Sequence, residues 1–98
     1  MTIEKKLNNT QLTLSIIGRL DTSTAPELEK VITDDLNGVT ELTIDCKELE
    51  YVSSAGLRVI LKAQKKMSVL GGMKVVNVNE AIMEVFEITG FSDILTIE

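Results

Sequence analysis

Hydrophobic and polar residues alternate along two stretches of the chain, residues 11–17 and 42–46, and this alternation predicts two half-buried β-strands. Successive side chains of a strand point to opposite faces, so one face of each strand is expected in a core and the other near water. Gly18 is expected to end the first of these strands. Two further strands are expected over residues 3–7 and 73–78.

Three other stretches carry apolar residues at intervals of three or four positions, which is typical of helices with one buried face. The first helix is expected to begin near Thr24, whose spacing from Glu27 is that of a capping box. The second is expected over residues 55–69. The third is expected to begin at Asn79 and to end near Gly90.

The resulting order, strand-strand-helix-strand-helix-strand-helix, predicts an α/β fold. Strands covered by helices on both faces are continuously apolar, so the alternation favours a mixed sheet with helices packed mainly on one face. A final apolar pair, Ile94 and Leu95, is expected to dock on the core. No repeat or linker interrupts the pattern, and residues 1–98 are therefore expected to form a single domain.

The amino-acid composition limits the kinds of core and of catalytic or metal site that the chain can form. One tyrosine and two phenylalanines are the only aromatic residues, so the core must be aliphatic. The chain has no histidine, and it therefore lacks the commonest general base and metal ligand. Its single cysteine, Cys46, excludes an internal disulfide and a cysteine-based zinc site, and it is expected to be a buried structural thiol. An enzyme, a metal site and a cofactor are not expected.

Charge and hydropathy indicate the compartment and the class of partner. The net charge of −5 argues against nucleic acid, whose phosphates require a basic surface. No apolar run approaches the length of about 20 residues that a membrane span needs, and the first residues lack the apolar core of a signal peptide. We therefore expect a soluble cytoplasmic protein without a membrane partner.

Two adjacent serines, Ser53 and Ser54, lie between a strand-like segment and the second helix. A hydroxyl at a helix start accepts a hydrogen bond from an otherwise unpaired N–H group, so capping explains one serine there. The small residues Ala55 and Gly56 follow and keep the site open. The segment thus predicts either a helix cap or a phosphorylation site that another protein reaches.

A basic face is expected on the second helix, in an otherwise acidic chain. It comprises Arg58, Lys62, Lys65 and Lys66. Such a face is most often only solvated, but it can also steer an acidic partner.

Residues 18–25, Gly-Arg-Leu-Asp-Thr-Ser-Thr-Ala, and residues 51–57, Tyr-Val-Ser-Ser-Ala-Gly-Leu, together resemble the STAS family. This family contains the bacterial anti-sigma-factor antagonists and the related cytoplasmic domains of sulfate transporters. The resemblance spans nearly the whole chain. It implies a mixed sheet of four or five strands with about four helices packed mainly on one face.

The resemblance also implies roles for individual residues. The family's phosphoacceptor is the hydroxyl two positions before the loop glycine, which here is Ser54. Aspartate is typical at the preceding position, where this chain has Ser53, and Ser53 is therefore a rival acceptor. Asp21 and Asp45 occupy positions that lie near the acceptor loop in the family. The partner-binding residues expected here are Asp21, Thr24, Ser53, Ala55, Gly56 and Arg58.

The function implied by the resemblance is a switch by charge. The unphosphorylated loop would bind an anti-sigma factor with serine-kinase activity and so release a sigma factor. A phosphate of about 1.5 to 2 negative charges would weaken that contact, and a serine phosphatase would reset it. A monomer or weak dimer is expected. Two alternatives stay open: a constitutive STAS interaction module without a phosphorylation cycle, and a domain that binds a small ligand such as a nucleotide.

Overall fold

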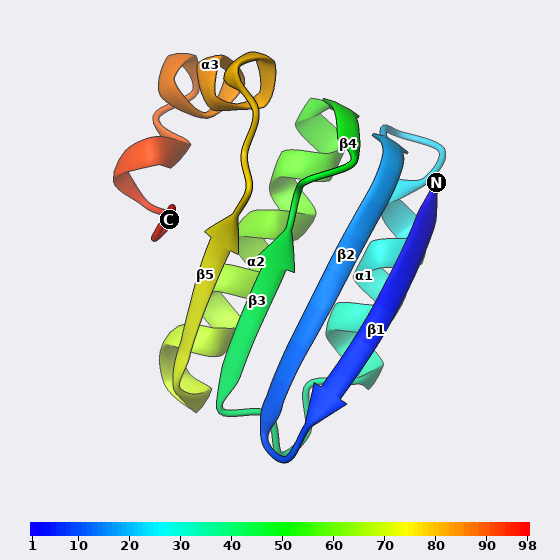
Figure 1. Cartoon of the computed structure of the whole chain (residues 1–98), viewed down its shortest axis with the longest axis vertical. Coiled ribbons are helices and arrows are strands. Elements are labelled where there is room, and N and C mark those ends of the chain that lie inside the picture. The colour runs from blue at the N-terminus through cyan, green and yellow to red at the C-terminus, as the bar shows by residue number, and fades with distance from the viewer.

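The strands and helices of the computed structural model, which describes residues 1–98, follow the polarity pattern closely (Figure 1). In chain order they are β1 (Thr2–Asn8), β2 (Gln11–Leu20), α1 (Ala25–Asp34), β3 (Glu41–Asp45), β4 (Leu49–Val52), α2 (Ser54–Leu70), β5 (Gly72–Val76), α3 (Glu80–Ile88) and a short 3-10 helix, η1 (Phe91–Asp93). The α/β class expected from the sequence is confirmed.

The five strands form one mixed sheet. Its main path runs β1-β2-β3-β5, with β1 antiparallel to β2 and the other neighbours parallel. Strand β4 pairs in parallel with the last residues of β2, beyond the part of β2 that pairs with β3. At the β5 edge, Ile97 adds a parallel bridge to Val75.

The inward residues of β2, β3 and β5 form the core together with α1 and α2. Leu14, Ile16 and Ile44 are fully buried, and the whole buried cluster contains 24 apolar residues and no buried polar or charged side chain. The intervening Thr13, Ser15 and Thr43 are only half-buried. Helices α1 and α2 both lie behind the sheet as it is seen in Figure 1, so the prediction of helices mainly on one face is confirmed.

Strand β2 is longer than expected, because Gly18 does not end it. The glycine adopts a left-handed backbone angle, φ of +96°, and the strand continues to Leu20. The register with β4 shifts between Gly18 and Arg19. This irregularity also explains why the polarity pattern did not reveal β4, whose burial runs buried-exposed-exposed-buried instead of alternating.

The helices also differ from expectation in places. There are three α-helices and one 3-10 helix of three residues, against about four expected. Asn79 begins α3 as predicted, and its side chain accepts a hydrogen bond of 2.9 Å from the Ile82 N–H. Of the final apolar pair, Leu95 is buried but Ile94 is 49% exposed, so docking of both residues was wrong. None of the helices combines the length and apolarity needed to cross a membrane.

Candidate functional site

The segment Ser53–Gly56 is called the serine loop here. Its first residue, Ser53, is held in place by hydrogen bonds of both its backbone and its side chain. The Ser53 N–H donates to the Leu20 carbonyl oxygen at 2.9 Å, which holds the loop against the end of β2. Its hydroxyl oxygen accepts a 3.3 Å hydrogen bond from the Gly56 N–H. Ser53 is therefore the N-cap of α2, with the extended backbone that this position requires.

Ser54, the first residue of α2, is in a different situation. Its side chain is exposed, and its hydroxyl makes no hydrogen bond within the chain. It lies at the end of a 17-residue helix where the backbone dipole favours negative charge. The two serines thus divide the roles that the sequence left open: Ser53 caps the helix, and Ser54 presents a free hydroxyl to solvent.

Gly56 is required by packing inside the molecule, between the start of α2 and the end of β2. It is buried, and a Cβ added to it would lie 2.6 Å from Leu20 Cγ and 3.0 Å from the Leu20 carbonyl oxygen. Its φ is not positive, so an unusual backbone angle does not explain this glycine. Glycine is needed because α2 and the end of β2 approach each other so closely, and Gly56 offers no side chain to a partner.

The turn between β2 and α1 is built around the Asp21 carboxylate. Its Oδ1 accepts hydrogen bonds from the Ser23 hydroxyl at 2.8 Å, the Ser23 N–H at 3.0 Å and the Thr24 N–H at 3.1 Å. These bonds, led by the one from the Ser23 side chain, lower the pKa of Asp21 below its ordinary value despite some opposing desolvation. Asp21 therefore remains a carboxylate that organises its own turn.

The capping box expected for Thr24 and Glu27 does not form. Thr24 is the N-cap residue of α1, but its side chain makes no capping hydrogen bond. The hydroxyl instead donates to the Arg19 carbonyl oxygen at 2.8 Å and accepts from the Asp21 N–H at 2.8 Å. The Thr24 hydroxyl therefore stabilises the β2–α1 turn and not the first turn of α1. Pro26 lies in the first turn of α1, where its missing N–H group costs little.

Pairing of β2 with β4 brings the Asp21 turn and the serine loop together, since Leu20 is opposite Val52. Asp21, Thr24, Ser53 and Ala55, which are all half-buried, and the exposed Arg58 accordingly belong to one end of the molecule.

Asp45 is engaged elsewhere. Its Oδ1 accepts hydrogen bonds of 3.0 Å from the Lys47 N–H and from the Asn77 side chain, at the end of β3. It stabilises the start of the β3–β4 connection.

The sequence reading missed an aromatic contact beside the loop. Arg19 and Tyr51 face each other across β2 and β4, and the guanidinium carbon lies 4.2 Å from the centre of the tyrosine ring. Arg19 Nε is also 3.8 Å from Asp21 Oδ2. Tyr51 is 41% exposed, so this pair is accessible from the surface. Tyr51 is the first residue of the 51–57 motif, but only the pairing of β2 with β4 shows that its ring contacts Arg19.

The basic face of α2 is only partly free. Lys62 Nζ lies 3.2 Å from Glu29 Oε1, and Lys66 Nζ donates to the Ile32 and Thr33 carbonyl oxygens at 3.0 and 3.3 Å. Both lysines therefore form contacts that link α2 to α1. Arg58 and Lys65 are exposed and have no ion pair, so they are the free cations of this face.

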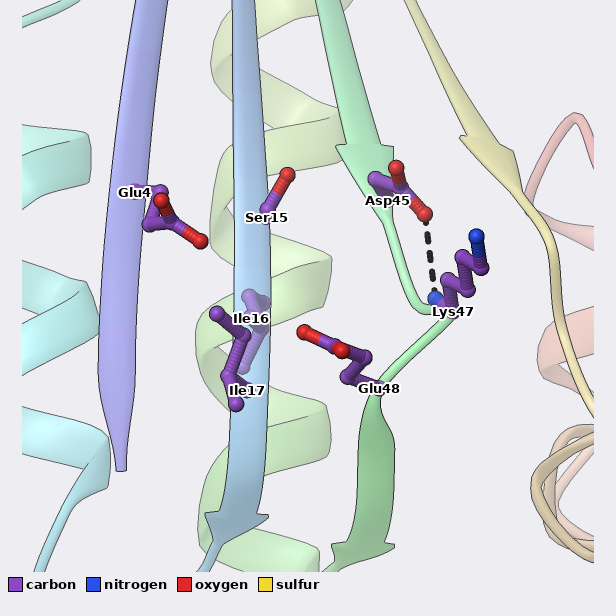
Figure 2. Close-up of a pocket in the computed structure, with 7 residues that line it drawn as sticks. All are labelled: Glu4, Ser15, Ile16, Ile17, Asp45, Lys47 and Glu48. Atoms are coloured by element: carbon purple, nitrogen blue, oxygen red, sulfur yellow. Dashed lines mark hydrogen bonds between the residues drawn. The ribbon is translucent and has the colours of Figure 1, made fainter.

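The surface hollows lie away from the serines. Figure 2 shows one of about 80 Å³ on the open face of the sheet, lined by Glu4, Ser15, Ile16, Ile17, Asp45, Lys47 and Glu48. Neither serine of the loop lines this hollow or the two others on the open face. No group of three or more histidine, cysteine, aspartate or glutamate residues is arranged to hold a metal ion.

Cys46 is fully buried, as predicted. Burial, with a smaller contribution from the negative charge of Asp45, raises the pKa of its thiol to about 12. The thiolate, which is the reactive form, is thus suppressed.

Comparison with known proteins identifies the family and supports the fold. The STAS domain profile matches residues 2–98. The anti-sigma-B factor antagonist of Bacillus subtilis is 30% identical over 96 residues, which are 97% of this chain and 88% of the relative. An anti-sigma factor antagonist from Mycobacterium paratuberculosis has a solved structure with a TM-score of 0.88 at 25% identity, covering 98% of this chain and 83% of the other. Bacillus SpoIIAA, solved in its phosphorylated form, has a similar fold, with a TM-score of 0.69 at 16% identity and coverage of 99% and 91%. The chain belongs to the STAS family.

Proposed function

We propose that this chain is an anti-sigma factor antagonist that binds its partner through the β4–α2 loop and the first turns of α2, and that phosphorylation of Ser54 switches this binding off. The Bacillus subtilis protein that it resembles is named an anti-sigma-B factor antagonist, and the Mycobacterium paratuberculosis protein an anti-sigma factor antagonist. The proposal places the chain in the cytoplasm, because sigma factors and their antagonists meet there. Its action is by binding and not by catalysis.

The observation that carries the proposal is the difference between the two serines. Ser53 has its hydroxyl committed to the Gly56 N–H, whereas the exposed Ser54 hydroxyl has no partner. A kinase can reach Ser54 without opening the helix cap. The helix N-terminus also tolerates the phosphate that would result, so the fold itself need not change.

Arg58 explains how a phosphate would alter the surface. It is four residues after Ser54 on α2, and residues at this spacing lie on the same side of a helix. In the unmodified chain Arg58 is a free cation beside the loop. A phosphate of about 1.5 to 2 negative charges on Ser54 would pair with it and reverse the sign of the local charge. A partner that binds the unmodified surface would then meet repulsion.

The proposed partners follow from this switch. An anti-sigma factor with serine-kinase activity both binds the loop and modifies it, and a serine phosphatase removes the phosphate. ATP is bound by the kinase partner. The exposed Tyr51, stacked on Arg19, extends the docking surface on the side of the Asp21 turn.

The acceptor assignment is tested by incubating the chain with its anti-sigma kinase and ATP, followed by intact mass spectrometry. We expect one phosphate on the wild-type chain, none on Ser54→Ala, and a slower reaction on Ser53→Ala because that change frays the helix cap. Phosphate retained by Ser54→Ala and lost by Ser53→Ala would reassign the acceptor. If no variant takes up phosphate while the wild-type chain still binds the partner, the chain is a constitutive module, as the serine in place of the family's usual aspartate at position 53 would allow.

The docking surface is tested by charge substitutions and calorimetric titration with the anti-sigma factor. Ser54→Asp should weaken binding about tenfold or more but leave the thermal midpoint within a few degrees, since a charge at this terminus changes stability by only about 0.3–1 kcal/mol. Arg58→Glu should also weaken binding and slow association. Lys65→Glu, two turns further along the same helix, is the matched control and should bind normally. Equal effects of the substitutions at Arg58 and Lys65 would place the contact elsewhere.

A further inference from the structure

Strand β1 is the free edge of the sheet. It lies at one side of the molecule in Figure 1, and β2 is the only strand that pairs with it. The opposite edge is partly covered, because Ile97 forms a bridge to Val75 on β5. All seven residues of β1 except Ile3 are exposed. A free strand edge carries unpaired N–H and C=O groups that can pair with another strand.

The seven side chains of β1 complement a second copy of the same strand. In an antiparallel pair, residues that face each other share the same hydrogen-bonding type, so two copies can align only where the facing residue numbers add up to an even total. When the numbers of facing residues add up to 10, all seven residues of β1 are paired with β1 of the other copy. This alignment sets Thr2 opposite Asn8, Ile3 opposite Leu7, Glu4 opposite Lys6, and Lys5 opposite its own counterpart.

On the open face this alignment forms two ion pairs. Glu4 is opposite Ser15 in β2, and Lys6 is opposite Thr13, so both side chains share the face of those half-buried residues. Neither has an ion pair within its own chain. In the dimer, Glu4 of each copy meets Lys6 of the other. The neighbouring alignments fail on this face, because a total of 8 opposes Glu4 to itself and a total of 12 opposes Lys6 to itself.

On the helix face the alignment forms two apolar contacts. Ile3 is opposite the buried Ile16 and is itself half-buried, whereas Leu7 is 65% exposed in the single chain. Each Leu7 would pack against Ile3 of the other copy. The two central Lys5 side chains do not meet as free cations, because each Lys5 Nζ lies 2.7 Å from Asp35 Oδ2 of its own chain.

We propose that the chain forms a homodimer by antiparallel pairing of β1 with β1 of a second copy, which joins the two sheets into one. This β1–β1 interface does not cover the serine loop of either copy. Thr2 is opposite Ile17, near the β2 end that leads to the Asp21 turn, and Thr2 faces Asn8 of the other copy. The two loops therefore lie at opposite ends of the joined sheet, and each can bind a partner independently.

The test is a charge exchange measured by sedimentation velocity over a range of concentrations. The wild-type chain should pass from monomer to dimer as its concentration rises. Glu4→Lys alone and Lys6→Glu alone should each weaken dimerisation about tenfold or more, because two attractive pairs become two repulsive ones. An equimolar mixture of the two variants should recover the dimer, since each of the two facing pairs then joins a lysine of one variant to a glutamate of the other. The double variant E4K/K6E should recover it as well.

Circular dichroism of each variant checks that the fold persists, and Leu7→Asp supplies a variant that disrupts the other face of the interface. A wild-type chain that stays monomeric at every concentration would overturn the proposal. A dimer unaffected by the single substitutions, or a mixture that fails to recover, would equally overturn it. Binding of the anti-sigma factor by the monomeric Leu7→Asp variant should be unchanged, so this result is independent of the proposed function.

Discussion

At the scale of single residues, a close fit between helix and sheet lies beneath the serine loop. Leu20 ends β2 and is fully buried, and Gly56 packs directly on it in the first turn of α2. The position tolerates no Cβ, because the Leu20 carbonyl oxygen and side chain occupy that space. This contact determines how near the helix start comes to the sheet, and hence where Ser54 is presented.

We therefore predict that Gly56→Ala lowers the free energy of unfolding by about 1–3 kcal/mol through overpacking. Urea unfolding followed by circular dichroism measures this loss. Gly72→Ala is the control, because a Cβ at Gly72 would lie 3.5 Å from Glu41 Oε1, which is ordinary contact. Its effect should stay below about 1 kcal/mol. Equal losses in the two variants would show that the Leu20 contact yields without cost.

At the scale of elements, short side-chain networks and not helix propensity hold the loops of the candidate site. The β2–α1 turn depends on Asp21, which accepts hydrogen bonds from Ser23 and Thr24. The β4–α2 loop depends on Ser53, which bonds to Leu20 on one side and to Gly56 on the other. Each network satisfies the backbone of one segment, and the pairing of β2 with β4 joins them.

The Asp21 network predicts a pH dependence. Because folding lowers the pKa of Asp21 below 3.8, the stabilisation it provides is present above pH 3.8 and is lost as the pH falls through the lower, folded value. Asp21→Asn keeps an acceptor oxygen but removes the charge. The difference in unfolding free energy between the wild-type chain and Asp21→Asn should therefore be constant near neutral pH and should shrink below pH 3.8. A difference that stays constant into this acid range would contradict the role assigned to the carboxylate.

At the scale of the whole molecule, one buried thiol reports on the integrity of the sheet. Cys46 follows β3, has no exposed surface, and has its pKa raised to about 12. A reagent can reach it only after the core opens.

We predict that a thiol reagent at pH 8 modifies the native chain at least about a thousandfold more slowly than the chain in denaturing urea, since the open fraction of a stable domain is about 10⁻³ or less. Spectrophotometric detection of the released chromophore gives both rates. Gly56→Ala should react faster than the wild-type chain, by about tenfold for each 1.4 kcal/mol of unfolding free energy that it loses. Rapid labelling of a chain that keeps its native circular dichroism would instead reveal local opening at the end of β3.

The alternation of apolar residues was sufficient to predict the one-sided mixed sheet, and the three-to-four spacing was sufficient to predict three helices close to their observed bounds. These features depend on residues near in the chain, where the period of the side chains follows directly from the local backbone. The loop motif was likewise visible, because its small residues and hydroxyls are adjacent. Strand β4 was not visible, since an irregular register removes the alternation that identifies a strand.

The sequence by itself thus determined the fold class, the family resemblance and the position of the serine loop. Only the tertiary structure decided which serine is the cap, why Gly56 is a glycine, where the Thr24 hydroxyl bonds, and that Lys62 and Lys66 bond to groups of α1. The physical reason is the same at each position. These roles are set by competition among nearby donors, acceptors and side-chain volumes. For Gly56, Lys62 and Lys66 the competing groups are brought close by strand pairing and helix packing, over separations of more than 30 residues in the chain. For the Ser53 and Thr24 hydroxyls the bonding partners lie within five residues, and the folded turn selects among them.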